Sequence, residues 1–155
     1  MVAHDSRVDA FTRFVMDRES RLRESLIAVF GGEIGRDAAA EALEYGWDNW
    51  DRIGRMENPS GYLFKVGLSR GRNVLSKRRP LFDPVEPARI PDVEPRLPEA
   101  LSSLSERQRT VVLLIHSFQW TQSEVADLLG LSKSTVQNHL ERGMGALRRE
   151  IGDST

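Results

Sequence analysis

The chain has 155 residues, of which 39% are hydrophobic, and its formal net charge is -1. This apolar content is enough for packed cores and excludes a disordered chain, while the length allows one domain or two small ones. The absence of cysteine excludes disulfides, thiolate metal sites and cysteine nucleophiles. No signal peptide and no stretch long enough to span a membrane is visible, so we expect a cytoplasmic protein without membrane insertion.

Two amphipathic helices are predicted in the first third of the chain. Apolar residues recur at helical spacing between residues 8 and 29, after a capping-box-like pair formed by Ser6 and Asp9, and a pair of glycines should end this helix. A second helix is predicted from Asp37 to Trp50. Its tryptophans are expected to pack in or near the core.

A third, basic helix is predicted after the irregular stretch of residues 51–60. Asn58 and the following proline fit the N-cap and the first helical position. Residues 60–79 hold six basic residues and no acidic one, with Tyr62 and Phe64 near the start. Basic residues interleaved with aromatic ones suit a nucleic acid strand whose bases are unstacked. A solvated positive surface is the alternative.

The apolar line of this third helix is expected to run through Leu63, Val66, Arg70 and Val74. Arg70 is therefore ranked below the other cations of the helix as a nucleic acid contact. Gly67, with a second glycine one turn later, would let another helix or a nucleic acid backbone come close.

Prolines divide the chain. Six of the seven lie between Pro80 and Pro98, where they prevent a helix and favour an extended, acidic connector. We therefore predict an all-α fold with two small helical domains, residues 1–79 and 98–155, joined by a linker of residues 80–97. In the second domain a short helix is expected from Pro98 to Leu104.

A capping box of Ser105 and Gln108 then begins a buried helix, VVLLIHSF, in which His116 is expected at the core or its boundary. Thr121 and Glu124 form another capping box, which begins a short helix that Gly130 ends. Ser132 is the predicted N-cap of a long final helix. The apolar positions of that helix are Val136, Leu140, Met144 and Leu147.

These two helices and their turn predict a helix-turn-helix, whose second helix would enter the major groove of DNA. Glutamine and asparagine can pair bidentately with adenine, serine and threonine reach bases or phosphates, and Lys133 and Arg142 would lie nearer the phosphates. A solvated helix face is the alternative. The residues expected at the groove are Lys133, Ser134, Thr135, Gln137, Asn138, His139 and Arg142.

Taken together, the two halves resemble a bacterial sigma factor of the sigma-70 superfamily, of the small two-domain group called extracytoplasmic-function (ECF) sigma factors. The stretch LPEALSSLSERQRTVVLLIHSFQWTQSEVADLLGLSKSTVQNHLERGMGALR resembles region 4 of that family. Residues Phe11 to Arg79 resemble region 2 more weakly. There, Tyr62-Leu63-Phe64-Lys65-Val66-Gly67-Leu68-Ser69 stands where the family usually has a Trp-Leu-Tyr-Arg-Ile-Ala-x-Asn run.

The resemblance implies an alternative sigma factor that binds core RNA polymerase and directs promoter recognition and transcription initiation. The second half would read the −35 element as duplex, and an anti-sigma factor is a further partner that the resemblance admits. Polymerase contacts would come from Asp37, Glu41, Glu44 and Trp47. The −10 element would be melted and held by Asn58, Tyr62, Lys65, Arg72, Asn73, Lys77 and Arg78.

Two functions of other classes stay open at this point. One is a conventional helix-turn-helix regulator whose N-terminal helices dimerise or sense a ligand, and which needs no polymerase. The other is an adaptor of the same fold that binds only protein. An enzyme is least expected, because no metal cluster, phosphate-binding loop or nucleophile-base pair is visible, and neither a cofactor nor a metal is predicted.

Overall fold

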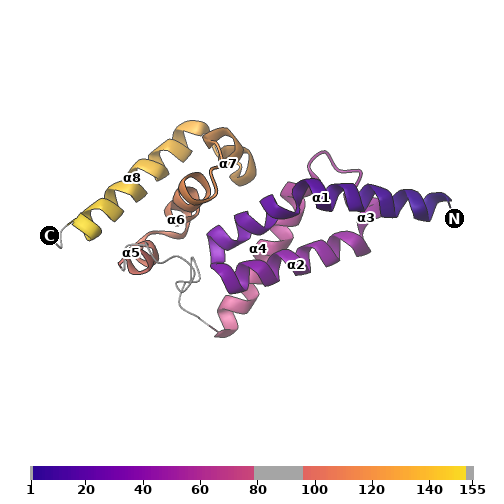
Figure 1. Ribbon diagram of the computed structural model, residues 1–155, viewed down its shortest axis with the longest axis horizontal. Helices are drawn as coiled ribbons and strands as arrows, with labels where there is room; N and C mark the ends of the chain where they lie inside the picture. The colour runs from indigo at the N-terminus through magenta and orange to yellow at the C-terminus, as the bar shows by residue number, and fades with distance from the viewer. Residues whose placement is uncertain (1, 79–95, 153–155) are drawn as a thin grey trace. The chain divides into compact units, whose positions relative to one another are not determined.

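The computed structural model describes residues 2–78 and 96–152, and within these ranges the chain is helical and contains no strand (Figure 1). The predicted all-α class is confirmed. None of the described helices is long and apolar enough to cross a membrane. The elements are α1 (Val2–Phe30), α2 (Gly32–Asp48), α3 (Trp50–Ile53), α4 (Pro59–Arg78), α5 (Leu97–Ser103), α6 (Glu106–Val112), the π-helix η2 (Leu113–Ser117), α7 (Gln122–Leu129) and α8 (Lys133–Gly152).

The chain divides into two compact units. The first contains Met1–Leu26 and Glu33–Pro80, and the second contains Ile27–Gly32 and Leu81–Thr155. The predicted linker, residues 80–97, lies outside the described residues except for its last two. The domain boundaries therefore stay predictions.

The first two helices begin earlier than predicted. α1 already begins at Val2, so Ser6 lies inside it and does not cap it. No glycine or proline interrupts these first turns, and the helix therefore extends through them. Gly31 adopts a φ of 89°, which glycine tolerates, and α2 begins directly after it at Gly32 instead of at Asp37. Glu33 in the first turn of α2 favours this start through the helix dipole.

Close helix packing holds the first unit together. The side chains of Leu26, Ile53 and Leu63, from α1, α3 and α4, have no solvent exposure. A β-carbon at Gly67 would lie 2.5 Å from Cδ1 of Leu26, which is closer than van der Waals contact allows. Gly67 therefore lets α4 approach α1, which confirms the helix-packing alternative predicted for this glycine.

The buried line of α4 differs from the prediction. Phe64 is 3% exposed and Gly71 is buried, whereas Val66 is half-buried and Arg70 is exposed. The 3.6-residue repeat places Phe64 and Gly71, with Leu63, on the side that faces the unit's core. Phe64 is therefore unavailable to support an extruded base, and Arg70 is not part of the apolar line.

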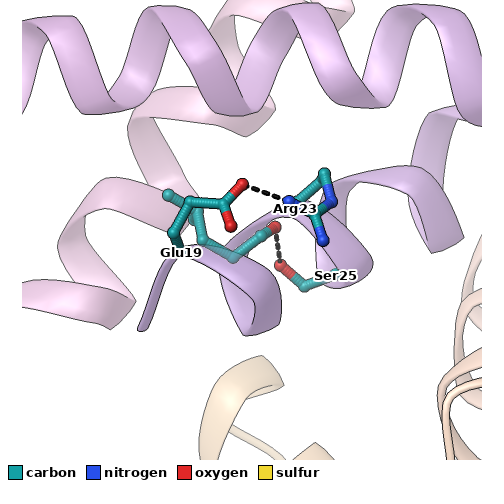
Figure 2. Close-up of polar contacts among 4 residues, drawn as sticks. Glu19, Arg23 and Ser25 are labelled. Carbon is teal, nitrogen blue, oxygen red and sulfur yellow. Dashed lines mark hydrogen bonds and ion pairs between the residues drawn. The ribbon is translucent and has the colours of Figure 1, made fainter. Parts of the chain in front are cut away.

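A local hydrogen bond satisfies the buried polar side chain of α1. Ser25 has no solvent exposure, and its hydroxyl donates to the carbonyl oxygen of Leu22 at 2.7 Å (Figure 2). Glu19 and Arg23, one turn apart, form an ion pair at a spacing that supports a helix (Figure 2). The bond to Leu22 lets α1 bury the Ser25 hydroxyl without an unpaired donor.

The second unit packs α5 to α8 around one apolar core. The predicted buried segment VVLLIHSF leaves α-helical geometry after Val112 and continues as η2, where the N–H of Phe118 donates to the carbonyl of Leu113 at 3.1 Å. His116 is exposed in this π turn, so its predicted place at the core is wrong. The core of this unit includes Ala100, Leu101, Leu104, Val111, Val112, Leu113, Leu114, Trp120, Val125, Ala126, Val136 and Leu147.

Candidate nucleic-acid interfaces

The helix-turn-helix begins with a complete capping box. The N–H of Glu124 donates to the Thr121 hydroxyl at 3.1 Å, and the N–H of Thr121 donates to the Glu124 carboxylate at 2.9 Å. Both amides belong to the first turn of α7, where no intrahelical acceptor exists. The predicted start of this helix is confirmed.

The turn between α7 and α8 follows the predicted pattern. Gly130 adopts the left-handed conformation, with φ 68° and ψ 35°, and ends α7. Leu131 is half-buried and packs on the core of the unit. Ser132 caps α8, because its hydroxyl accepts from the N–H of Thr135 at 3.1 Å.

α8 is amphipathic in the predicted sense. Val136 has no exposure and Leu147 is 6% exposed, and Leu140 and Met144 pack against the same core from half-buried positions. On the opposite side the predicted groove residues differ in exposure. Those that are exposed are Lys133, Ser134, Asn138 and Arg142, and those that are half-buried are Thr135, Gln137 and His139.

Gln137 and Asn138, the two predicted adenine readers, lie in different surroundings. Gln137 donates to the Glu141 carboxylate at 2.8 Å and accepts a hydrogen bond from the Gln122 amide. A bidentate contact to adenine would have to replace these bonds. Asn138 is exposed, and we infer that it is the better placed of the two to reach a base edge. Gln122 was missed from the sequence because it belongs to the preceding helix.

His139 has an electrostatic environment that disfavours its charged form. Burial lowers the pKa of its imidazole below the ordinary value of 6.5, and the positive charges of Arg107 and Arg142 lower this pKa further. The neutral form of the side chain, with one nitrogen that donates and one that accepts hydrogen bonds, is therefore favoured over the charged form more than in an ordinary histidine.

On α4 the predicted −10 residues do not form one compact group. Lys65, Arg72, Asn73 and Lys77 are all exposed. The side chain of Arg78 lies outside the described part of the structure. Arg72 and Asn73 share an open groove between α2 and α4, and Lys65 and Lys77 do not line it. The lining residues of this groove are Tyr45, Val66, Ser69, Arg70, Arg72 and Asn73.

Asn58 caps α4, as the sequence predicts. Its side-chain oxygen accepts from the N–H of Gly61 at 3.0 Å, and its carbonyl accepts from the N–H of Tyr62 at 3.2 Å. Its amide oxygen therefore stabilises the first turn of the helix, and its side chain stays exposed at the end of the 51–60 stretch.

Tyr62 belongs to a cluster that the sequence did not reveal. The Arg52 guanidinium donates to the hydroxyl of Tyr45 at 3.1 Å and to that of Tyr62 at 3.5 Å. The guanidinium carbon also lies over the Tyr62 ring, 5.5 Å from its centroid. The hydrogen bond from Arg52 is the main reason why the pKa of Tyr62 lies below its ordinary value of 10.0.

The predicted polymerase residues of α2 separate into two kinds. Asp37, Glu41 and Glu44 are exposed at spacings of four and three residues and therefore share one acidic stripe. Trp47 is half-buried, with its ring centroid 5.4 Å from that of Phe11. The guanidinium of Arg7 covers it at 4.4 Å. Trp47 thus has the packing role that its sequence pattern favours, against Phe11 and Arg7.

Within the described ranges, no group of three or more histidine, cysteine, aspartate or glutamate residues could hold a metal ion.

The amino-acid sequence is similar to those of bacterial sigma factors. Residues 95–147 match the family model for sigma-70, region 4. The RNA polymerase sigma-E factor of Streptomyces avermitilis is 26% identical over 153 residues, covering 91% of this chain and 84% of that protein. The ECF RNA polymerase sigma factor SigG of Mycobacterium tuberculosis is 39% identical over 99 residues, covering 59% of this chain and 25% of that protein.

The fold agrees with this class. The sigma factor RpoE from Bartonella quintana, solved with the anti-sigma factor NepR, superposes with a TM-score of 0.61 at 20% identity, covering 92% of this chain and 96% of that one. At this identity the likeness supports the fold alone. Residues 95–147 thus belong to sigma-70, region 4, and the relatives that align beyond this region are named RNA polymerase sigma factors, including an ECF sigma factor.

Proposed function

We propose that this protein is an alternative sigma factor that binds core RNA polymerase in the cytoplasm and directs promoter recognition and transcription initiation. One observation carries the proposal: a fully capped helix-turn-helix, with an exposed polar face on the N-terminal half of α8, lies inside the region 4 match. Like sigma factors in general, the protein would act in initiation without catalysing a reaction of its own.

In this function the second unit reads the −35 element. The polar face of α8 would enter the major groove, with Asn138 at base edges and with Lys133 and Arg142 near phosphates. Ser134 and Thr135 would contact bases or phosphates at the N-terminal end of the same helix. Gln137 and His139 lie on the same face and would contribute where their local environments allow.

The first unit engages the polymerase and the −10 element. Its acidic stripe of Asp37, Glu41 and Glu44 would dock on the polymerase. Trp47 would hold α2 against α1 through its packing on Phe11. The exposed cations of α4 would neutralise the backbone of the melted strand. The −10 set comprises Asn58, Tyr62, Lys65, Arg72, Asn73, Lys77 and Arg78.

A conventional regulator of the helix-turn-helix class is less well supported. Such a protein needs similarity to sigma factors only in its DNA-binding half, whereas the Streptomyces relative aligns with 91% of this chain. Co-purification tests this choice directly: the tagged protein should retain core RNA polymerase from a bacterial lysate. A protein that binds duplex DNA and retains no polymerase would be a regulator.

The role of α4 is tested by a double change, Lys65→Ala with Arg72→Ala. We expect the variant to bind core polymerase normally and to lose open-complex formation on a duplex promoter, because two phosphate contacts to the melted strand are removed. A promoter with a pre-melted bubble should restore part of the activity, since unpairing then costs nothing.

A matched control removes two exposed arginines elsewhere in the same unit, through Arg13→Ala with Arg18→Ala on α1. This variant should open duplex promoters as the parent does. If the Lys65 and Arg72 variant also transcribes at the parental rate, α4 is a solvated surface and does not take part in melting.

An anti-sigma factor is a further partner that we propose, on the likeness to a sigma factor solved in such a complex. A genomic neighbour that lowers transcription by this protein and binds it stoichiometrically would support this partner. Transcription that no co-expressed neighbour lowers would count against it.

A further inference from the structure

An arginine joins three helices beside the groove between α2 and α4, which Tyr45 lines. Arg52 comes from α3, and its two phenol partners come from α2 and α4. The guanidinium reaches the Tyr45 oxygen at 3.1 Å and the Tyr62 oxygen at 3.5 Å, and it lies over the Tyr62 ring. These are the only two tyrosines of the chain. The cluster therefore contains every phenol side chain that the protein has.

This cluster is not part of the core. Arg52 is exposed and both tyrosines are half-buried, so the contact contributes little to apolar packing. An exposed arginine normally keeps its rotamer freedom in water, whereas three contacts restrict this one. Such an arrangement orders an aromatic surface before any ligand arrives, and preordered surfaces lose less entropy on binding.

The cluster also borders a surface suited to a nucleic acid strand. Tyr45 lines the groove together with Arg70, Arg72 and Asn73, so one phenol of the cluster lies in a groove that also carries two cations and an amide. A duplex would present only stacked bases to this groove. A single strand can offer a base to an aromatic ring and its phosphates to arginines at the same time.

We propose that Arg52 is a positioning residue: it fixes the Tyr62 ring, with Tyr45, as a stacking platform for one unpaired base of the DNA strand that α4 holds. The inference rests on the proposed sigma function and adds a named role for Arg52 and Tyr45 to it. Tyr62 touches the base, Arg52 acts through Tyr62, and Tyr45 anchors the guanidinium at the groove.

The test uses holoenzyme assembled from core RNA polymerase and the full chain. A fluorescent single strand is first selected from a randomised pool by the wild-type holoenzyme, and it is then resynthesised with an abasic site at each position in turn. Binding is compared for Arg52→Gln, Tyr62→Ala and Tyr62→Phe. Arg55→Gln is the matched control, because Arg55 is an exposed arginine in the turn that directly follows α3.

Tyr62→Ala should weaken strand binding by about five- to a hundredfold, which is the range expected for loss of one base stacked on an aromatic ring. Arg52→Gln should weaken it by about two- to fivefold, the size of an exposed cation-π contact. Both losses should disappear on the one strand whose abasic site removes the stacked base. Tyr62→Phe, which keeps the ring, should bind more tightly than Tyr62→Ala.

Two results would overturn the inference. If Arg52→Gln weakens every abasic strand as much as the intact one, Arg52 contacts the backbone and positions nothing. If Arg52→Gln leaves the binding of every strand unchanged, including the intact one, the cluster is only a surface contact. Failure of the wild-type protein to bind core polymerase or to select any strand would instead refute the proposed function, so the two failures are distinguishable.

A second readout follows Tyr62 itself in the protein without DNA. With ¹³C at the phenol carbon, NMR should show two tyrosine signals, one for each tyrosine of the chain. Because the Arg52 hydrogen bond lowers the pKa of Tyr62, Arg52→Gln should raise that pKa towards 10.0. Arg55→Gln should leave it unchanged. An unchanged Tyr62 titration in Arg52→Gln would contradict the positioning role.

Discussion

α4 and α8 are both 20 residues long and both present a polar face that we assign to promoter DNA, but different contacts organise the two faces. At α8 two contacts are local, since Ser132 caps the helix and the Gln137 amide pairs with Glu141 one turn away, and the Gln122 amide adds a bond from the preceding helix. At α4 the contacts are distant in sequence, since Tyr62 is held from Arg52 and Gly67 meets Leu26. A recognition surface can thus be built by a short motif or by tertiary packing.

The strongest test of this difference replaces one glycine in each helix. Gly67→Ala should destabilise the first unit by about 2 kcal/mol, because its β-carbon would overlap the fully buried Leu26. Gly145→Ala should stabilise the second unit by about 0.5 to 1 kcal/mol, because its β-carbon would meet nothing closer than Nη1 of Arg149 at 3.7 Å.

Urea unfolding followed by NMR of the indole N–H signals measures both effects in the full chain. Trp47 and Trp50 report on the first unit, and Trp120 reports on the second. Equal destabilisation by the two alanines would mean that Gly145 is packed as tightly as Gly67, which would remove the contrast between these two positions.

The next effect comes from single contacts of α8 and is confined to DNA binding. Asn138→Ala should cost roughly 1 to 3 kcal/mol at one base position of the −35 element and little elsewhere. Lys133→Ala should weaken all sequences and reduce the dependence of binding on salt. Gln137→Ala should change base preference less than Asn138→Ala, because the Gln137 amide is already bonded to its neighbours.

Holoenzyme binding to a library of −35 duplexes, at two salt concentrations, separates these three variants. An unaltered base preference in Asn138→Ala would show that this side chain does not read the groove. A salt dependence equal to that of the parent in Lys133→Ala would place Lys133 away from the phosphates.

The smallest effect concerns pH. The pKa of His139 in the folded protein is lowered below 6.5, so the unfolded chain binds a proton there before the folded chain does. Stability of the second unit should therefore fall as the pH drops through 6.5 towards the folded pKa, and it should be unaffected by this group above that window. His139→Gln should flatten this part of the profile, as followed by the Trp120 signal.

The motif-based predictions succeeded where neighbouring residues decide the structure. The capping box at Thr121, the left-handed Gly130 and the cap at Ser132 all follow from side chains a few residues apart, and all are confirmed. The predicted start at Asp37 was wrong because a helix can begin before its best apolar positions do. His116 was wrong because periodicity alone does not reveal a π turn.

Contacts between distant residues escaped prediction. No spacing rule connects Arg52 with Tyr45 and Tyr62, since the three belong to three different helices. The same limitation explains the wrong prediction for Phe64. Its place in an aromatic and basic stretch indicated a contact with nucleic acid, although its side chain belongs to the core.

The π turn at Leu113–Ser117 changes the number of residues in the segment that precedes α7 and α8. A π turn encloses one more residue per hydrogen-bonded ring than an α turn. Deleting one residue there, for example Ile115, would let the segment close as a regular α-helix, because the wider ring holds the extra residue within one turn. The π turn therefore marks a place in front of α7 where the chain length differs by one residue from that of a regular helix, away from the residues of α8 that we assign to DNA.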